Sequence, residues 1–378
     1  MGHILFAMIE VGFGHKGPAC AVKQCIEAAF QNPPIHTAEV LDFPSAVGAS
    51  RTDKTVKDAW NMALKHPWMV RAAYRFMEWI YPYHTAVLQL TMPDFFRWGS
   101  AYLVQNPPDL FVATHPMCLA VAVRARKRFS LSFPIIAHVV DPFDGYSLWA
   151  EKHADLFLVH SEESRWALRR HGIPSEKIRQ VPYPRLPAMN PPSRSREELR
   201  RQYGVGSNGK PVVLVTSGAQ GIGRVFSFVQ RSFLQGDPID YVVITARNTK
   251  LYAELQQIAQ QGRVPGKLIP LPLVDSMTDL YALCDVVTGK AGAATCMEAL
   301  YHKRPFICTE WAAQNDYSIV QFLISQRTGA FTPSFESFRK QLLETTNFNL
   351  FSLDIDTHAI MRILVDYMES SHAIHRSL

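Results

Sequence analysis

Short apolar runs alternate with longer amphipathic stretches along this chain, and this alternation constrains the fold more than any other feature. An apolar run followed by a helical pattern is typical of βαβ units, in which a helix connects two parallel strands. We therefore expect an α/β protein with two doubly wound, Rossmann-like domains. The strand candidates form two series: Ile4–Ile9, Thr37–Leu41, Leu110–Thr114, Ile135–Val140 and Leu156–Val159, then Val212–Thr216, Tyr241–Thr245, Leu268–Leu271, Asp285–Thr288 and Pro305–Cys308.

A passage rich in proline and charge, residues 182–197, separates the two series. The length of 378 residues is also long for a single hydrophobic core. We predict an N-terminal domain of residues 1–185, a linker of residues 186–205 and a C-terminal domain of residues 206–378, whose last helix can pack back on the N-terminal domain. Ligands of such sheets bind beyond the carboxyl ends of the strands, so a cleft between the domains is the predicted binding site.

Composition narrows the class of protein and its compartment. A formal net charge of +6 is too small to indicate a nucleic-acid-binding protein, but it suits contact with an anionic membrane surface. The six cysteines lie mostly in apolar runs without the spacing of metal ligands, which favours reduced core residues of a cytosolic protein. No run is long enough to span a bilayer, and the apolar N-terminus lacks a cationic leader. We expect a cytoplasmic protein.

Residues Lys290–Glu298 carry the strongest functional signal. They form a loop of small residues that follows an apolar run and leads into a helical stretch. Such a connection presents unpaired backbone N–H groups and the positive end of a helix to an anion. Glu298 would lie about one turn into the helix, where a carboxylate can accept hydrogen bonds from a ribose diol. The segment favours a nucleoside-diphosphate site, and the alternative is an ordinary strand–loop–helix connection.

The first predicted strand leads into Gly12, Phe13, Gly14 and His15, with a helix expected to begin near Pro18. The two glycines allow the backbone to turn sharply and to approach a ligand closely. His15 would project from the helix start, and its near-neutral pKa suits a general base. The alternative is a histidine that caps a turn.

Three further segments of the second series place glycine-rich or polar residues after predicted strands. Residues 217–223 form a glycine-rich turn, Arg247 and Asn248 follow the next strand, and Glu310–Tyr317 follow the last one. Backbone N–H groups, amides and carboxylates at these positions suit phosphate, base and sugar hydroxyls. A plain βα turn explains each segment alone, but their order within one domain favours a nucleotide site.

The stretch from Trp60 to Trp98 differs in character from the rest of the chain, because aromatic and basic residues are interleaved in it. Aromatic rings with lysine and arginine on an amphipathic helix suit the interface of an anionic bilayer. The alternative is that many of these rings belong to the domain core. The candidates for acceptor or membrane contact in this stretch are Trp68, Arg71, Arg75 and Trp79.

Taken together, these segments resemble those of monogalactosyldiacylglycerol synthases. That group belongs to a GT-B superfamily that also includes the peptidoglycan lipid-linked N-acetylglucosaminyltransferase and processive diacylglycerol glucosyltransferases. The resemblance runs in the same order through most of the chain. The matching motifs are Gly12–Lys16, Pro108–Pro116 with His115, His138–Asp141 with Trp149, Ala246–Asn248 and Lys290–Ala299.

The resemblance implies a GT-B fold and an inverting, metal-independent transfer of a hexose from a UDP-sugar to a lipid hydroxyl such as that of diacylglycerol. The C-terminal domain would bind the nucleotide and the N-terminal domain the acceptor. His15 or Asp141 would remove the acceptor proton, and His115, Tyr146 and Trp149 would contact the acceptor or the membrane. The donor would be held by Gly14, Gly218, Ala219, Gln220, Gly221, Arg247, Asn248, Leu273, Val274, Gly292, Ala293, Ala294, Thr295, Glu298, Asn315 and Asp316. The protein would associate peripherally with the inner face of the membrane.

Some positions depart from the pattern of these relatives. A Pro-Gly pair of the relatives is Ala293-Ala294 here, and the pair that contacts hexose hydroxyls is Asn315-Asp316. A histidine expected between Asp141 and Trp149 is Tyr146. The resemblance therefore implies a divergent member, in which the hexose and the lipid are not identified.

Three hypotheses follow. The first is a peripheral-membrane glycolipid glycosyltransferase, and the second is a nucleotide-sugar epimerase of the same fold. The third is a non-catalytic protein that binds a nucleotide sugar. Membrane binding separates the first from the second, and UDP binding separates both enzymes from a protein with a degraded site.

Overall fold

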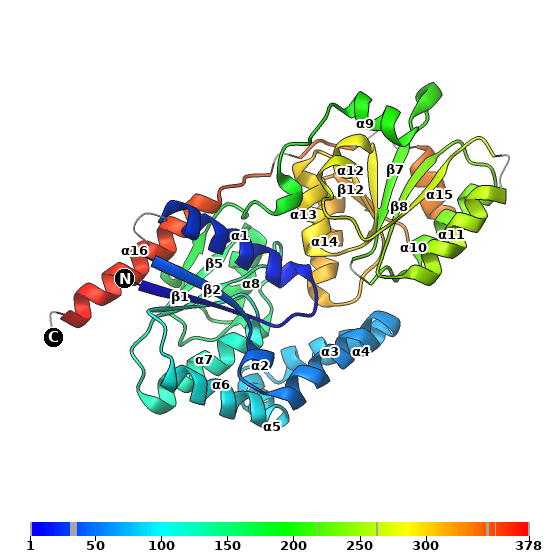
Figure 1. The fold of residues 1–378 in the computed structure, drawn as a ribbon. Coiled ribbons are helices and arrows are strands. Elements are labelled where there is room, and N and C mark those ends of the chain that lie inside the picture. The colour runs from blue at the N-terminus through cyan, green and yellow to red at the C-terminus, as the bar shows by residue number, and fades with distance from the viewer. Residues whose placement is uncertain are drawn as a thin grey trace. The chain divides into compact units, whose positions relative to one another are not determined.

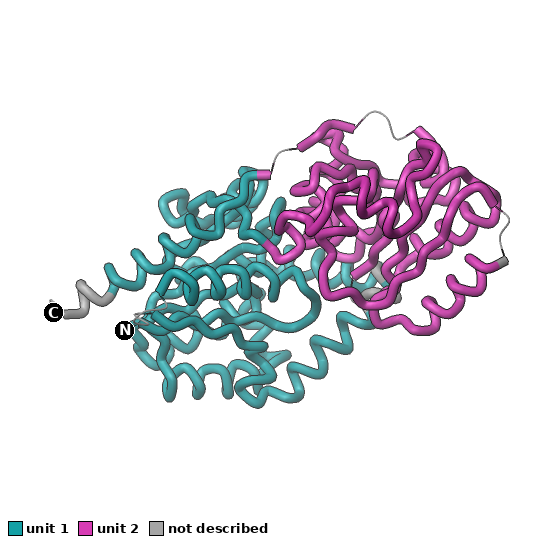
Figure 2. The backbone as a smooth tube through the Cα atoms, turned by 45° about the horizontal axis from the view of Figure 1, so that its top comes forward, with its two compact units in different colours: residues 1–185, 354–378 teal, residues 186–353 magenta. Residues whose placement is uncertain are grey.

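A computed structural model describes residues 2–30, 36–218, 220–261, 264–344, 348–351 and 353–376 (Figure 1). The chain forms two compact units, which Figure 2 distinguishes by colour. Residues 1–185 and 354–378 make up the first unit, and residues 186–353 make up the second.

The first unit contains a six-stranded parallel sheet with the strand order β2-β1-β3-β4-β5-β6. Five of these strands lie where the apolar runs predicted them, and the three-residue edge strand β6 was missed. The strands are β1 (Gly2–Met8), β2 (His36–Asp42), β3 (Leu110–Ala113), β4 (Ile135–His138), β5 (Leu156–Val159) and β6 (Ile178–Gln180).

Helices cover both faces of this sheet, so its strands are apolar on both sides. Ile4 and Phe6 of β1 pack toward one face and Leu5 and Ala7 toward the other, as the two-residue period of a strand requires. The helices of the first unit are α1 (Phe13–Ala29), α2 (Phe43–Ala46), α3 (Ser50–Lys65), α4 (Pro67–Trp79), α5 (His84–Thr91), α6 (Pro93–Gln105), α7 (Pro116–Phe129), α8 (Glu162–Arg170) and α16 (Thr357–Arg376).

The last helix, α16, belongs to the first unit although it follows the whole second unit in the sequence. It lies against α1 (Figure 1). Ile360 and Leu364 of α16 are fully buried in one cluster with Val22 and Ile26 of α1. Burial of these four side chains holds the C-terminal segment on the first sheet.

Helix α1 begins earlier than predicted. The sequence favoured a start near Pro18, but α1 begins at Phe13 and Pro18 lies inside it. Since proline has no N–H, the helical bond from residue 18 to the Gly14 carbonyl cannot form. The helix tolerates this loss within its first two turns, and His15 consequently lies in the first turn.

The second unit contains a second six-stranded parallel sheet, with the order β12-β11-β10-β7-β8-β9. The three-residue edge strand β12 was again missed from the sequence. The strands are β7 (Val212–Thr216), β8 (Asp240–Ala246), β9 (Leu268–Pro272), β10 (Val286–Lys290), β11 (Phe306–Glu310) and β12 (Gly329–Phe331), and the helices are α9 (Arg196–Tyr203), α10 (Val225–Leu234), α11 (Thr249–Gln261), α12 (Thr278–Leu283), α13 (Ala293–Tyr301), α14 (Gln314–Ser325) and α15 (Phe335–Leu343).

Residues 186–205, expected to be a linker, are part of the second unit. They contain α9, which Ser195 and Glu198 start with a reciprocal capping box. The Arg200 guanidinium donates to the carboxylate of Asp285, just before β10, at 2.7 Å. Proline-rich composition obscured this helix, although the capping box was visible in the sequence.

Strand order reverses at one point in each sheet, between β1 and β3 in the first and between β7 and β10 in the second. Ligands of doubly wound sheets bind at such switch points, beyond the carboxyl ends of the strands. The loops after β1, β3, β7 and β10 are therefore the expected ligand-binding positions. Among the described helices, none has the length and apolar character that crossing a bilayer requires.

Candidate functional site

His15 lies at the switch point of the first unit, where the loop after β1 meets the loop after β3. Its Nδ1 is 2.6 Å from the carbonyl oxygen of Thr114. Since a carbonyl oxygen can only accept, Nδ1 carries a proton and donates it to this bond. In the neutral imidazole, Nε2 is then the unprotonated nitrogen. The Thr114 carbonyl, directly after β3, thus fixes the tautomer in which Nε2 is unprotonated.

His115 is adjacent to this histidine but has a different role from the predicted one. It is buried, its ring centroid lies 4.7 Å from that of His15, and its Nδ1 accepts the Met117 N–H at the start of α7. Burial, reinforced by the neighbouring His15, lowers the pKa of His115 well below its usual value. Predicted as an acceptor or membrane contact, His115 is instead a neutral residue that caps α7 and supports the His15 ring.

Asp141 lies beyond the carboxyl end of β4, the strand next to β3. It begins a segment that we call the acceptor segment, residues Asp141–Trp149. Trp149 is fully buried, and its indole Nε1 donates to Asp141 Oδ2 at 2.8 Å. Tyr146 is buried as well, with its ring centroid 4.9 Å from that of Tyr74 on α4. Trp149 and Tyr146 were predicted to contact acceptor or membrane; in the structure both are buried inside the unit, and Trp149 holds the Asp141 carboxylate.

The glycine-rich turn of the second unit follows β7 at the second switch point. Gly221 has a φ of 56°, and a Cβ atom there would lie 2.1 Å from the Thr245 carbonyl oxygen. The turn therefore packs against β8 in a way that only glycine allows. Gly14 is half-buried in the first turn of α1, Gly218 and Gln220 are exposed, and Ala219 lies outside the described residues.

Asn248 ties this turn to the end of β8. Its Nδ2 donates to the Gly221 carbonyl at 2.9 Å, and its Oδ1 accepts the Leu251 N–H at 3.0 Å. Arg247 or Asn248 was predicted to hold the edge of the nucleotide base. In the structure both ends of the Asn248 amide bond to backbone groups, so that Asn248 caps α11 and fixes the turn. Arg247 beside it is exposed, as is Leu273 after β9, while Val274 is half-buried.

Helix α13 begins at the second switch point directly after β10. Its N-cap is Gly292, with no side-chain cap and no acidic residue in the first turn. The first-turn residues Ala293, Ala294 and Thr295 are half-buried. A helix start with unpaired N–H groups and no carboxylate nearby attracts an anion such as a diphosphate.

Glu298 is the sixth residue of α13 and is buried. It accepts a hydrogen bond from the Tyr281 hydroxyl of α12 at 2.8 Å. Burial raises the pKa of Glu298 to about 7 despite this bond. The carboxyl group is thus poised between its protonated and ionised forms near neutral pH. Tyr281 had no signal in the sequence that linked it to this position.

Asp316 has a local role that differs from the predicted contact with sugar hydroxyls. Its Oδ2 accepts the N–H groups of Ala312 and Ala313, at 2.9 and 3.3 Å, and caps α14. Asn315 beside it is half-buried. On the neighbouring β11, Glu310 accepts the Arg224 N–H at 2.8 Å and thereby holds the end of the glycine-rich turn. Arg224 is exposed, and the sequence reasoning had not selected it.

Helices α3 to α5 of the first unit expose many large apolar side chains. Trp68 is 67% exposed and Trp79 is 80% exposed. Arg75 is exposed beside them and Arg71 is half-buried. The other exposed apolar residues of this surface are Met62, Met69, Phe76, Tyr83 and Leu90.

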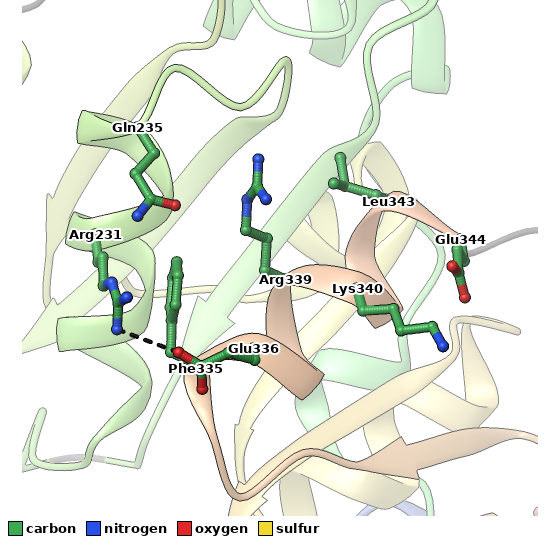
Figure 3. Close-up of a pocket in the computed structure, with 8 residues that line it drawn as sticks. All are labelled: Arg231, Gln235, Phe335, Glu336, Arg339, Lys340, Leu343 and Glu344. Atoms are coloured by element: carbon green, nitrogen blue, oxygen red, sulfur yellow. Dashed lines mark ion pairs between the residues drawn. The ribbon is translucent and has the colours of Figure 1, made fainter.

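A pocket of the second unit lies between α10 and α15 (Figure 3). Arg231 and Gln235 line it from the end of α10 that leads into β8. This end is at the amino termini of the strands, so the pocket lies at the edge of the sheet opposite to the second switch point. Arg231 pairs with Glu336 across it at 3.6 Å. Within the described residues, no group of three or more His, Cys, Asp or Glu side chains is arranged to hold a metal ion.

Two protein-family models match the chain. The monogalactosyldiacylglycerol (MGDG) synthase model matches residues 15–184, and the model of the glycosyltransferase family 28 C-terminal domain matches residues 212–317. The first match lies within the first unit and includes His15, Asp141 and the acceptor segment. The second lies within the second unit and includes the glycine-rich turn, α13 and Glu298.

Curated relatives extend this similarity. A probable chloroplastic MGDG synthase of Nicotiana tabacum is 23% identical over 354 residues, which cover 88% of this chain and 62% of the relative. The processive diacylglycerol β-glucosyltransferase of Bacillus licheniformis is 25% identical over 211 residues, covering 54% of this chain and 53% of the relative. The chain thus spans less than two thirds of the length of either protein.

Solved structures resemble the whole chain. MurG of Acinetobacter baumannii superposes with a TM-score of 0.61 at 12% identity, covering 97% of this chain and 100% of MurG. A UDP-GlcNAc 2-epimerase of Neisseria meningitidis, solved with UDP-GlcNAc bound, gives 0.56 at 12% identity, covering 97% and 99%. At such identities the likeness shows the fold alone, which is α/β and GT-B-like.

Proposed function

From the similarity of both halves of the chain to MGDG synthases and family 28 glycosyltransferases, we propose that this protein transfers a hexose from a UDP-sugar to a lipid hydroxyl, such as that of diacylglycerol. The observation that carries the proposal is the hydrogen bond from His15 Nδ1 to the Thr114 carbonyl. This bond leaves Nε2 as a base at the switch point of the first unit. The proposed activity needs one such base and a site for a departing diphosphate.

The second unit would bind the donor. The N-terminal N–H groups of α13 would take the diphosphate together with backbone groups at Gly218–Gly221. Arg247 and Arg224, both exposed near this edge, supply cations within the same unit. Glu298 would take the ribose, exchanging its bond from Tyr281 for bonds from the ribose hydroxyls. Leu273 would pack against the base.

In the proposed reaction, His15 Nε2 takes the proton of the acceptor hydroxyl as its oxygen attacks the anomeric carbon. The bond between that carbon and the β-phosphate oxygen breaks, and its electron pair leaves with UDP. Attack from the face opposite UDP inverts the anomeric configuration. The negative charge that develops on the diphosphate is stabilised by the amide N–H groups and dipole of α13. These groups are part of the chain, so the proposed step demands no bound metal.

Asp141 is the alternative base. It lies on the same edge of the first sheet as His15, but its carboxylate is buried and accepts the Trp149 N–H. Its Oδ2 is thus already engaged by the Trp149 indole, whereas the proton on Nδ1 of His15 leaves Nε2 as an acceptor. His15 is therefore the preferred base in the proposal.

The acceptor would be reached from a membrane surface. Exposed tryptophans with arginines on α4 have the composition of an interfacial helix that binds anionic lipid. The six cysteines are free thiols, as expected in a reducing compartment. We place the protein peripherally on the cytoplasmic face of a membrane.

The test is to incubate the purified protein with single UDP-sugars and diacylglycerol in vesicles and to measure product masses. A hexosyl-diacylglycerol and free UDP are expected, with inverted anomeric configuration by NMR, and activity is expected to persist in EDTA. A UDP-sugar that changes its configuration without any acceptor would support the epimerase instead. UDP binding without turnover of any sugar would support a non-catalytic protein.

A further inference from the structure

Helix α4 has two faces with different surroundings. Trp68, Arg75 and Trp79 are spaced to share one side of the helix, and all three are exposed. Tyr74 and Glu78, four residues apart, share another side, which faces the acceptor segment. The helix that carries the proposed lipid-binding surface therefore also contacts the segment that contains Asp141.

The contact between Glu78 and the acceptor segment is specific. Glu78 Oε1 accepts the backbone N–H of Ser147 at 2.8 Å. Ser147 is buried and begins a short 3₁₀ helix that ends at Trp149. An N–H in this position has no partner within its own helix, so the carboxylate satisfies a donor that would otherwise be buried without one.

From Ser147 the contact continues to Asp141. Within the same 3₁₀ helix the Trp149 N–H donates to the Tyr146 carbonyl at 2.9 Å, and the Trp149 indole donates to Asp141 Oδ2. The Tyr146 ring packs against Tyr74 of α4. Two residues of α4 therefore contact Tyr146 and Ser147, the start of the 3₁₀ helix whose last residue, Trp149, bonds to Asp141.

The other oxygen of Glu78 anchors α4 to the body of the unit. Glu78 Oε2 is 2.9 Å from Nε2 of His171, which follows α8, and the Tyr81 hydroxyl donates to the His171 carbonyl. Partial burial opposes ionisation of Glu78, but hydrogen bonds from His171 and Ser147 and the charge of His171 outweigh it and lower its pKa to about 2. Glu78 is thus ionised at neutral pH and bridges the acceptor segment and α8.

We propose that α4 couples lipid binding to the acceptor segment, with Glu78 as the residue that positions Ser147 and, through Trp149, Asp141. A bilayer that binds Trp68 and Trp79 restricts α4, and the Glu78–Ser147 bond transmits this restriction to the acceptor segment. The inference rests on the proposed function, since it assigns a regulatory partner, an anionic lipid surface, to the same site. Glu78 acts through other residues and is a positioning residue.

The experiment compares wild type, Glu78→Ala and Glu78→Gln with a control, Glu176→Ala. Glu176 is exposed in the same unit and forms no hydrogen bond with another described residue. Hydrogen exchange of residues 141–149 is followed by mass spectrometry with and without vesicles of phosphatidylcholine and phosphatidylglycerol. Transfer kinetics, vesicle co-sedimentation and UDP titration calorimetry are measured on the same samples.

For wild type and Glu176→Ala, vesicles are expected to slow exchange at residues 141–149. Glu78→Ala is expected to bind vesicles and UDP as wild type does, yet to lose this slowing and at least tenfold in kcat, with the KM for the UDP-sugar unchanged. Glu78→Gln keeps an acceptor for the Ser147 N–H. It is expected to recover part of the slowing of exchange and part of kcat. The split between kcat and KM and the rescue by glutamine separate positioning from a general loss of stability.

The coupling would be overturned if vesicles slowed hydrogen exchange at residues 141–149 in Glu78→Ala as much as in wild type. An unchanged kcat in Glu78→Ala would overturn it as well. Wild-type protein that transfers no sugar would instead refute the proposed function. The exchange measurement does not depend on transfer, so it would still decide whether α4 communicates with the acceptor segment. A Trp68→Ala/Trp79→Ala variant is expected to lose both vesicle binding and the slowing.

Discussion

The two switch points of this molecule present different kinds of chemical group. In the first unit, the group is a side chain: His15 donates through Nδ1, which leaves Nε2 unprotonated in the neutral ring and able to act as the proposed base. In the second unit, the polar side chains predicted to hold the donor are largely used inside the protein. Asn248 and Asp316 cap helices, and Glu298 bonds to Tyr281. What remains for a ligand there is mainly backbone, at the start of α13 and in the glycine-rich turn.

This difference indicates which kind of substitution should disturb each half of the proposed reaction. A general base is a single group, so removal of one side chain in the first unit should abolish the chemistry. A backbone site cannot be removed by truncating a side chain. It is disturbed by changes that move the chain, such as a methyl group added where two segments touch.

The largest expected effect is that of His15→Ala. Loss of a general base typically lowers kcat by about 10²–10⁴-fold, and UDP affinity should stay unchanged because His15 belongs to the first unit. The measurement is transfer kinetics together with calorimetric titration of UDP. His153→Ala, which removes an exposed histidine of the same unit, is the matched control. Surviving transfer in His15→Ala would assign the role of base to Asp141.

A second prediction tests the backbone character of the donor site with a pair of glycines. Gly221→Ala should destabilise the second unit by at least about 2 kcal/mol, because its φ is left-handed and the new methyl group would meet the Thr245 carbonyl. Gly218→Ala, with a similar φ of 69° but no atom within 4 Å of the new Cβ, should cost only about 1 kcal/mol. Urea unfolding measures both changes.

If the donor site is built from backbone, Gly221→Ala should also weaken UDP binding much more than Gly218→Ala does. Equal UDP affinity in the two variants would indicate that exposed side chains such as Arg247 and Arg224 dominate donor binding. Side chains would then dominate the chemistry of both units, and the contrast between a side-chain site and a backbone site would not hold.

The difference between the two sites also explains what could be predicted from the sequence. Strands buried on both faces are continuous apolar runs, so ten of the twelve strands in the described part of the chain were located; β6 and β12, with three residues each, were missed. The same pattern located the loops that follow the strands. Which of these loops lie at the switch points depends on strand order, and the apolar pattern does not give that order.

Partners of individual side chains were less accessible to prediction. Asn248 bonds to the backbone N–H of Leu251, three residues further along the chain, and Asp316 is the third residue of α14. Side chains of this kind commonly bond to local backbone at such positions. This local pattern favours helix capping, whereas the family resemblance favoured contacts with the donor. The partners of His15 and Glu298, Thr114 and Tyr281, are 99 and 17 residues away, and no local pattern identifies them.

A third prediction concerns Glu298, the buried side chain of the donor site. Its pKa of about 7 lies above the usual 4.5, so folding favours the protonated form, and ionisation costs stability as pH rises through this range. Binding to ribose hydroxyls requires acceptor oxygens, which the ionised form supplies best. UDP affinity of the wild type should therefore rise by roughly tenfold between about pH 6 and 8, following the ionised fraction.

Glu298→Gln controls for ionisation of UDP itself, because the glutamine does not titrate. The expected result is a smaller pH dependence of UDP affinity in Glu298→Gln than in wild type, measured by calorimetry in several buffers. Identical pH profiles would remove Glu298 from the donor site and leave it as a buried partner of Tyr281.

The smallest expected effect comes from the ion pair of Glu78 and His171 in the first unit. Hydrogen bonding to Glu78 raises the pKa of His171 above 6.5 although burial opposes this shift, so its contribution is present below pH 6.5 and is lost as pH rises through the raised pKa. The lowered pKa of Glu78 makes its contribution present above pH 4.5 and lost as pH falls toward about 2. The pair should therefore stabilise most between pH 4.5 and 6.5.

His171→Gln should lower the free energy of unfolding by less than about 1 kcal/mol in this window, since Glu78 is 39% exposed and solvent screens the pair. The difference from wild type should shrink at higher pH, and urea unfolding between pH 4.5 and 8.5 measures it. Arg170, Tyr81, His84 and Glu151 also face this cluster and remain in both proteins. A difference that grows with pH would mean that His171 stabilises α4 in its neutral form. Glu78 would then hold the acceptor segment through the Ser147 bond without support from the charge of His171.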